Sequence, residues 1–261
     1  MVDSLGDPIP IPHNVRLYFQ NGFGHISGVG LLAPPQPAGI CQNATQGETS
    51  IAVTARALVS VMDDWADRGI SPPPSNYPDK DDLVTLQEYR ALFPNIPGVQ
   101  PPTVMNEITV LNFGRLFNSE GGNQTILPPL LGSPYHVLVP KPSDDGPGVA
   151  GIKTIFTRAP IGTNVGWNIR AGLRAPDLCS LSGSFFPFSA TAEQRLANGD
   201  SRLSLQERYG SHQGFVKAVK KAVNELVEER FLLEVDADAF ITAAKASNVL
   251  VGQEGVDDDG D

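Results

Sequence analysis

The hydrophobic and polar positions of the chain predict three amphipathic helices. The first covers residues 50–68, where apolar side chains recur every fourth position and Gly69 follows as a natural stop. A longer helix is predicted from Ser211 to about Phe231, and another opens at Asp236. The expected inward-facing residues are Val53, Ala57, Leu58, Val61, Met62 and Trp65 in the first helix, Phe215, Val219, Val223, Leu226 and Val227 in the second, and Phe240, Ile241 and Ala244 in the third.

Capping sequences indicate three shorter helical segments. Thr85 and Glu88 have the spacing of a capping box, which predicts a short helix ending near Leu92. The segments 191–194 and 204–207 show the same spacing, with an Asn-Gly pair between them. The last third of the chain is therefore predicted to be mainly helical.

Strand composition is confined to a few short runs. The clearest are the apolar run from Val15 to Phe19, the segment 108–113, and residues 135–139, which end at Pro140. Pro, Gly and Asn dominate the rest of 93–134, which predicts long loops over a core made elsewhere. The Asp-Asp-Gly sequence at 144–146 predicts a solvated turn, because no further cation ligands are spaced after it.

The segment 160–170 places small residues around Trp167. Its glycines either permit a close approach of two backbones or shape a loop that buries the indole ring. A phosphate loop is excluded, because no Lys-Ser/Thr pair follows the glycines and no helical pattern begins there.

Composition narrows the class of protein. The 261 residues carry a net charge of −10, which argues against a nucleic-acid surface, since that needs clustered basic residues. No apolar run approaches the roughly 20 residues of a membrane span. The N-terminal residues lack the pattern of a signal peptide, and the localisation stays open. Cys41 and Cys179 either form one bridge or remain two buried thiols.

The candidate catalytic residue is His25, in the Gly-rich stretch from Val15 to Gly30. An apolar strand that ends in such a loop can carry a general base to the edge of a sheet. A serine nucleophile is missing, because the best match to G-x-S-x-G, at Ser184, lacks the second glycine and runs into Pro187. The four histidines show no metal-ligand spacing, so neither a metal nor a cofactor is predicted.

Several blocks resemble, in order, the C-terminal part of the large proteins of the α/β-hydrolase domain-containing family, which are distantly similar to tannases and feruloyl esterases. The blocks are VRLYFQNGFGHISG, RALVSVMDDWADRGISPPPSNYP, FPNIPGV, YHVLVP, VAGIKT, PIGTNVGWNIR and GSFFPFSATAEQRLANGDSRLSLQERYGSH. The resemblance implies an α/β fold in which the last strand of a hydrolase sheet, its His loop and a helix precede a loop-rich region and a helical C-terminal region. The expected boundaries are 1–78, 79–180 and 181–252, with an acidic tail at 253–261.

The resemblance also implies a function for His25. It would act as general base toward a serine and as acid toward the leaving alcohol of an ester-type small molecule. The serine and the acidic partner belong to the upstream half of the family's proteins, so we expect a fragment without independent activity. The alternatives are a non-catalytic interaction module and a subunit that complements a second chain.

Overall fold

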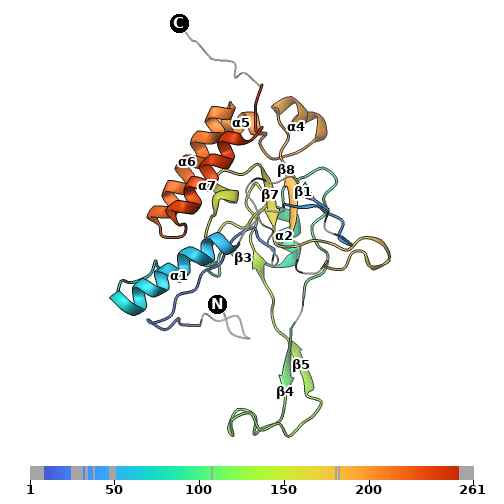
Figure 1. The fold of residues 1–261 in the computed structure, drawn as a ribbon. Helices are drawn as coiled ribbons and strands as arrows, with labels where there is room; N and C mark the ends of the chain where they lie inside the picture. Colours follow the sequence, from blue (N-terminus) through green and yellow to red (C-terminus); the bar gives the residue numbers. More distant parts are fainter. Residues whose placement is uncertain are drawn as a thin grey trace.

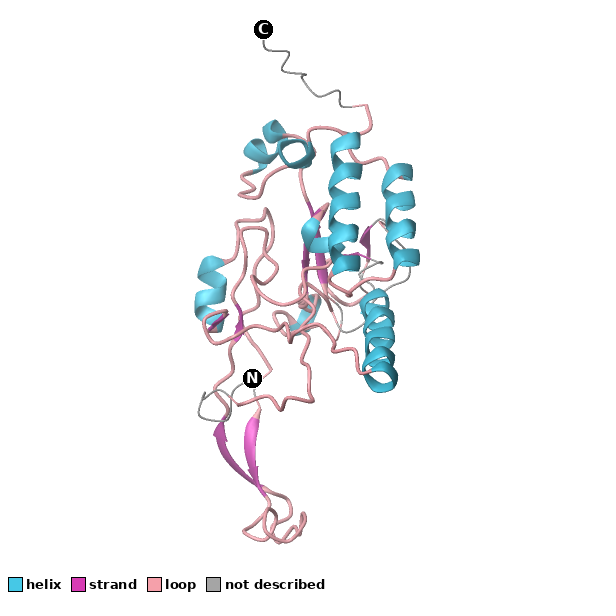
Figure 2. Cartoon of the chain, turned by 90° about the vertical axis from the view of Figure 1, so that its left-hand side faces the viewer, coloured by secondary structure: helices cyan, strands magenta, loops and turns pink. Residues whose placement is uncertain are grey.

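The computed structural model describes residues 9–24, 32, 35–37, 39–46, 51–106, 108–179, 181 and 183–252 (Figure 1). His25 and the acidic tail at 253–261 lie outside the described residues. The described chain combines helices with short strands, and a two-stranded hairpin projects away from the body (Figures 1 and 2).

Two antiparallel helices form one side of the body and bury the main hydrophobic core. They are α6 (His212–Glu228), which Ser211 caps as predicted, and α7 (Glu234–Ala246). Both lie side by side in Figures 1 and 2. Phe215 and Phe240 are almost completely buried between them and the short helix α3 (Ile155–Arg158). The predicted apolar faces of both long helices are confirmed.

The first predicted helix is α1 (Ile51–Arg68), with Val53, Ala57 and Val61 buried. Gly69 follows it at φ +67°, as the predicted stop requires. The prediction for Met62 was wrong, because its side chain is 60% exposed. The buried stripe of α1 is therefore narrower than the hydrophobic pattern indicates.

The shorter helices begin where the capping sequences predict. Thr85 and Glu88 form a complete capping box before α2 (Leu86–Leu92), and Ser204 does the same before α5 (Leu205–Tyr209). Thr191 caps α4 (Ala192–Asn198), which ends at Gly199 in the left-handed conformation. One 3₁₀ turn, η1 (Gly172–Arg174), has no side-chain cap.

The described strands form four separate antiparallel pairs. β1 (Pro35–Gln36) pairs with β2 (Thr45–Gln46), and β3 (Leu83–Val84) pairs with β6 (Val139–Pro140). β4 (Thr109–Asn112) pairs with β5 (Leu130–Pro134) in the projecting hairpin, and β7 (Gly162–Val165) pairs with β8 (Ser184–Pro187) in the body.

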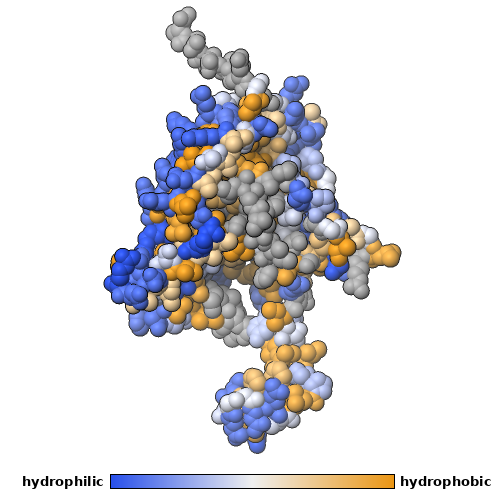
Figure 3. All heavy atoms as spheres, viewed as in Figure 1, coloured by the Kyte–Doolittle hydropathy of each residue, from blue (hydrophilic) through white to orange (hydrophobic). Residues whose placement is uncertain are grey.

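Two predictions about the middle of the chain need correction, and a third segment gains a strand. Residues 135–138 are not a strand, because no neighbouring strand pairs with them in the described chain. The segment 160–170, for which the sequence left two alternatives open, contains the buried strand β7. The hairpin β4–β5 does not lie over a core but extends into solvent with Leu131 75% exposed (Figure 3).

A second, smaller core lies beside β7 and β8. It contains Tyr89 and Phe93 of the α2 region together with Val165 and Phe186 of the strand pair, and Trp167 packs against it. Within the described ranges, no helix is long and apolar enough to cross a membrane.

Candidate functional site

The segment that precedes His25 in the sequence is an extended strand, which other described residues pair along one edge. Asn76 pairs with Tyr18, and Ile152 pairs with Gln20, both in parallel orientation. The backbone N–H of Phe19 donates to the Asn76 carbonyl at 2.8 Å, and the N–H of Ile152 donates to the Phe19 carbonyl at 2.7 Å. The apolar run is therefore extended and paired like a strand, as predicted. Its partners are single residues of two other segments and not a full neighbouring strand.

The opposite edge of this segment has no backbone partner among the described residues. In an extended chain, alternate residues direct their backbone N–H and C=O groups to the same side. Leu17, Phe19 and Asn21 use the side that faces Asn76 and Ile152. Across the described residues, the backbone groups of Tyr18 and Gln20 have no backbone partner. Such an unpaired edge is able to accept a further strand.

Residues 21–24 are held tightly before the chain reaches His25. The buried Asn21 side chain bonds both backbone groups of Gly148, accepting from its N–H at 2.8 Å. Gly22 has φ +78°, a backbone conformation that other residues rarely adopt, and a Cβ atom on Gly24 would lie 2.3 Å from the backbone nitrogen of Gly183. The glycines of this stretch are therefore required for a close approach of the backbone.

The same close approach involves the segment around Trp167. A Cβ atom on Gly166 would lie 2.6 Å from the carbonyl oxygen of Phe23. Of the two alternatives for the glycines of 160–170, close backbone approach is confirmed at Gly166. The residues before His25 thus pack directly against the loop that follows β7.

An apolar pocket of about 340 Å³ lies beside these residues. Phe19 to Phe23 form one wall, and Tyr89, Val165 and Trp167 form another. Pro102, Val104 and Met105, near the base of the projecting hairpin, complete the rim. Sequence reasoning did not find this pocket, because its walls come from segments that are far apart in the chain.

The indole N–H of Trp167 donates to the Tyr89 hydroxyl at 2.8 Å, so the two polar atoms of this wall satisfy each other. Burial raises the pKa of Tyr89 well above its ordinary value, although the hydrogen bond from Trp167 opposes the shift. Tyr89 therefore keeps its hydroxyl proton at neutral pH.

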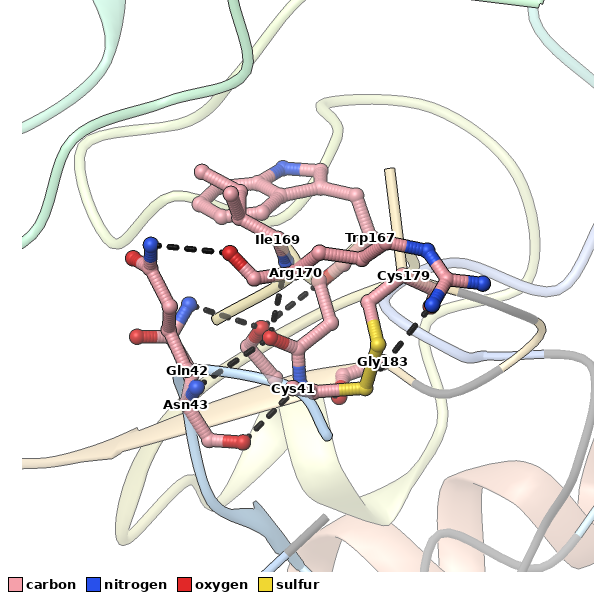
Figure 4. The surroundings of a disulfide bond; sticks show 10 residues. Cys41, Gln42, Asn43, Trp167, Ile169, Arg170, Cys179 and Gly183 are labelled. Atoms are coloured by element: carbon pink, nitrogen blue, oxygen red, sulfur yellow. Dashed lines mark hydrogen bonds between the residues drawn. A yellow bond between two sulfur atoms is a disulfide. The ribbon is translucent and has the colours of Figure 1, made fainter. Parts of the chain in front are cut away.

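A disulfide bond joins Cys41 to Cys179, which are far apart in the sequence (Figure 4). The open question from the sequence is thereby answered in favour of one bridge. The buried Asn168 reinforces the connection, because its side-chain amide donates to the carbonyls of Asn43 and Gly183, each at 2.9 Å. Leu178, the neighbour of Cys179, lines the pocket.

Ser184 lies in β8 and is unsuited to act as a nucleophile. It is only 2% exposed, and its hydroxyl donates to the Trp167 carbonyl at 2.6 Å while accepting from the Asn43 amide at 3.3 Å. A strand position without a following helix is not a nucleophile elbow. The structure therefore agrees with the sequence analysis, which rejected Ser184 as a nucleophile.

The other histidines lie apart from the pocket. His13 and His136 are exposed, and Nδ1 of His212 lies 2.8 Å from the Val249 carbonyl. The described residues contain no group of three or more His, Cys, Asp or Glu side chains that could hold a metal ion.

The chain belongs to the alpha/beta hydrolase domain family, whose model matches residues 7–242. No curated protein and no solved structure matches the chain. Family membership indicates a hydrolase-type function, while the residues that perform it are not identified by the match.

Proposed function

We propose that the chain is the C-terminal portion of a serine-dependent carboxylic-ester hydrolase and that His25 is its general base. The observation that carries this proposal is the strand of residues 17–21, which lines the apolar pocket, precedes His25 in the sequence, and has one edge without a backbone partner among the described residues. A hydrolase sheet needs neighbouring strands, and this edge is the place where they would pair.

In this proposal His25 takes the proton from a serine hydroxyl as the serine attacks the ester carbonyl. It then gives that proton to the leaving alcohol, and the same two transfers repeat when water releases the acyl group. Imidazole suits both transfers, because its ordinary pKa of about 6.5 lies close to neutral pH. The serine and the acidic residue that orients His25 would lie on polypeptide outside these 261 residues.

The state of Ser184 supports a nucleophile from outside the chain. Its hydroxyl is buried and already bonded on both sides, and no serine of the chain has the full G-x-S-x-G context. The segments 1–78, 79–180 and 181–252 would then be the end of the hydrolase core, a loop-rich region and a helical region, followed by the tail at 253–261.

A fluorophosphonate probe tests this proposal, because it forms an adduct with an activated serine. We expect no labelled serine when the purified chain is treated with the probe and its peptides are analysed by mass spectrometry. The DNA upstream of the codon for Met1 and the neighbouring genes should encode a segment with a serine elbow, and that segment should be labelled when the two are produced together. An adduct on any serine of this chain would overturn the proposal.

The second candidate function is a non-catalytic interaction module, or a subunit that complements another chain. The observation that favours it is the projecting hairpin β4–β5, whose apolar residues face solvent (Figure 3). An isolated hairpin is marginally stable in water, so a partner surface would stabilise it. If the chain is an interaction module, the variant His25→Ala should still bind its partner, and no neighbouring gene should encode a serine elbow. If the chain is a complementing subunit, ester turnover should require both His25 and a second chain with a serine elbow.

A further inference from the structure

We propose that the apolar pocket beside residues 19–23 binds an uncharged, apolar group of one or two rings, and that this group is part of the ester substrate. The first half of the proposal concerns binding alone. The second half rests on the proposed function, since it identifies the bound group as the part of the ester next to the reacting carbonyl.

The chemistry of the walls determines the class of ligand. None of the described residues that line the pocket is Asp, Glu, Lys, Arg or His. The polar side chains in the walls bond to the protein itself. Gln20 donates to the Thr54 hydroxyl at 3.1 Å, Asn21 bonds to Gly148, and Trp167 donates to Tyr89.

A charged ligand would lose its hydration in such a pocket without gaining a counter-charge. Burying an ion without a partner costs far more than burying a neutral group of the same shape. An apolar group gains instead, at about 25 cal/mol for each Å² of its surface removed from water. The walls therefore select neutral, apolar ligands over charged ligands of equal size.

Size and position limit the ligand further. A volume of about 340 Å³ lies at the small end of the range of about 300–1,000 Å³ that is typical of ligand pockets. The wall from Phe19 to Phe23 ends two residues before His25 in the sequence. A substrate whose apolar group fills the pocket would therefore have its ester group near the segment that carries the proposed base.

A substitution at the rim can block the pocket without disturbing the buried core. Val104 lies at the rim and is 41% exposed, so the variant Val104→Arg can fold while the guanidinium group stays in water. Val59 on α1 is also exposed and does not line the pocket. Val59→Arg is thus a matched control for Val104→Arg.

Binding can be measured on the full chain through the fluorescence of Trp167, with Trp65→Phe as background to remove the other indole. We expect saturable changes with benzyl alcohol and with cyclohexylmethanol, and at least tenfold weaker binding of benzoate. Val104→Arg should weaken benzyl alcohol binding at least fivefold, and Val59→Arg should leave it unchanged. Equal binding of benzoate, or no saturable binding of either alcohol, would overturn the proposal.

The two proposals fail in different ways. If the alcohols bind but the chain paired with a serine-elbow segment hydrolyses no ester, the proposed function is wrong and the pocket remains a ligand site. If the pair hydrolyses esters but Val104→Arg changes KM equally for apolar and polar esters, the assignment of the pocket to substrate is wrong.

Discussion

The disulfide between Cys41 and Cys179 should stabilise the fold chiefly by restricting the unfolded chain. The two cysteines are separated by 138 positions, and cross-linking so long a loop removes about 5 kcal/mol of unfolded-state entropy in the chain-entropy model. Measured effects are commonly smaller, at about 2–4 kcal/mol. We expect the double variant Cys41→Ala/Cys179→Ala to lose an amount in this range.

The native structure around the bond should survive its removal. The N–H of Gln42 donates to the Ile169 carbonyl at 2.8 Å, and the N–H of Ala171 donates to the Ile40 carbonyl at 2.9 Å. These bonds and those of Asn168 hold residues 40–43 beside residues 168–171, and the N–H of Cys179 donates to the Asn168 carbonyl at 2.8 Å (Figure 4). The variant should therefore fold to the same structure with a lower free energy of unfolding.

Urea denaturation with and without a thiol reductant measures the effect. Reductant should lower the midpoint for the wild-type chain and leave the cysteine-free variant unchanged, which controls for other effects of the reagent. Titration of thiols should find none in the oxidised protein, whether folded or unfolded. Free thiols, or a loss of stability below about 1 kcal/mol on removing both cysteines, would refute the reasoning, because a closed loop of this length restricts the unfolded chain more than that.

Three further predictions concern the framework around the site. Asn168→Ala should lower the free energy of unfolding by about 2–4 kcal/mol in urea denaturation, because it leaves buried carbonyls without donors; a loss below about 1 kcal/mol would contradict this. Hydrogen bonds from Arg195 and Ser204 lower the pKa of Glu207 to about 2 from 4.5. The contribution of the ionised Glu207 to the free energy of unfolding is therefore complete above about pH 4.5 and is lost as the pH falls toward 2. Glu207→Gln should therefore be less stable than wild type at pH 7, and a difference that persists at pH 2 would refute the assignment. Replacing residues 109–134 by Asn-Gly should change the free energy of unfolding by less than about 1 kcal/mol, because the N–H of Tyr135 already bonds the Ile108 carbonyl at 2.8 Å and the hairpin buries little; a larger loss would show that the hairpin supports the body.

The helices could be predicted from the sequence because their signals are local. The apolar residues at every fourth position in α1 and the two capping boxes are patterns within a few neighbouring residues. The helices that they predict are present in the structure. The strands could not be placed equally well. β7 contains Gly162 and Asn164, which have weak strand preference, and it forms because β8 pairs with it over its full length.

The candidate site depends mainly on long-range contacts. Within the site, only the glycines could be recognised from the sequence as unusual. The sequence left open whether they allow two backbones to approach closely, and the structure shows that Gly166 does so.

The buried ion pair between Asp200 and Arg202 was not predicted, because charged residues are seldom buried unless they are paired. Arg202 also donates to the Phe186 carbonyl at 2.9 Å, which connects the helical region to β8.

The most direct test of the central claim is the rate of p-nitrophenyl ester hydrolysis by the purified chain, alone and mixed with the polypeptide that carries the serine elbow. We predict no turnover by the chain alone and turnover by the mixture, reduced at least about a hundredfold by His25→Ala. His136→Ala, which replaces an exposed histidine, should leave the rate of the mixture unchanged. Turnover by the chain alone that disappears in His25→Ala would contradict the account and place the nucleophile within these 261 residues.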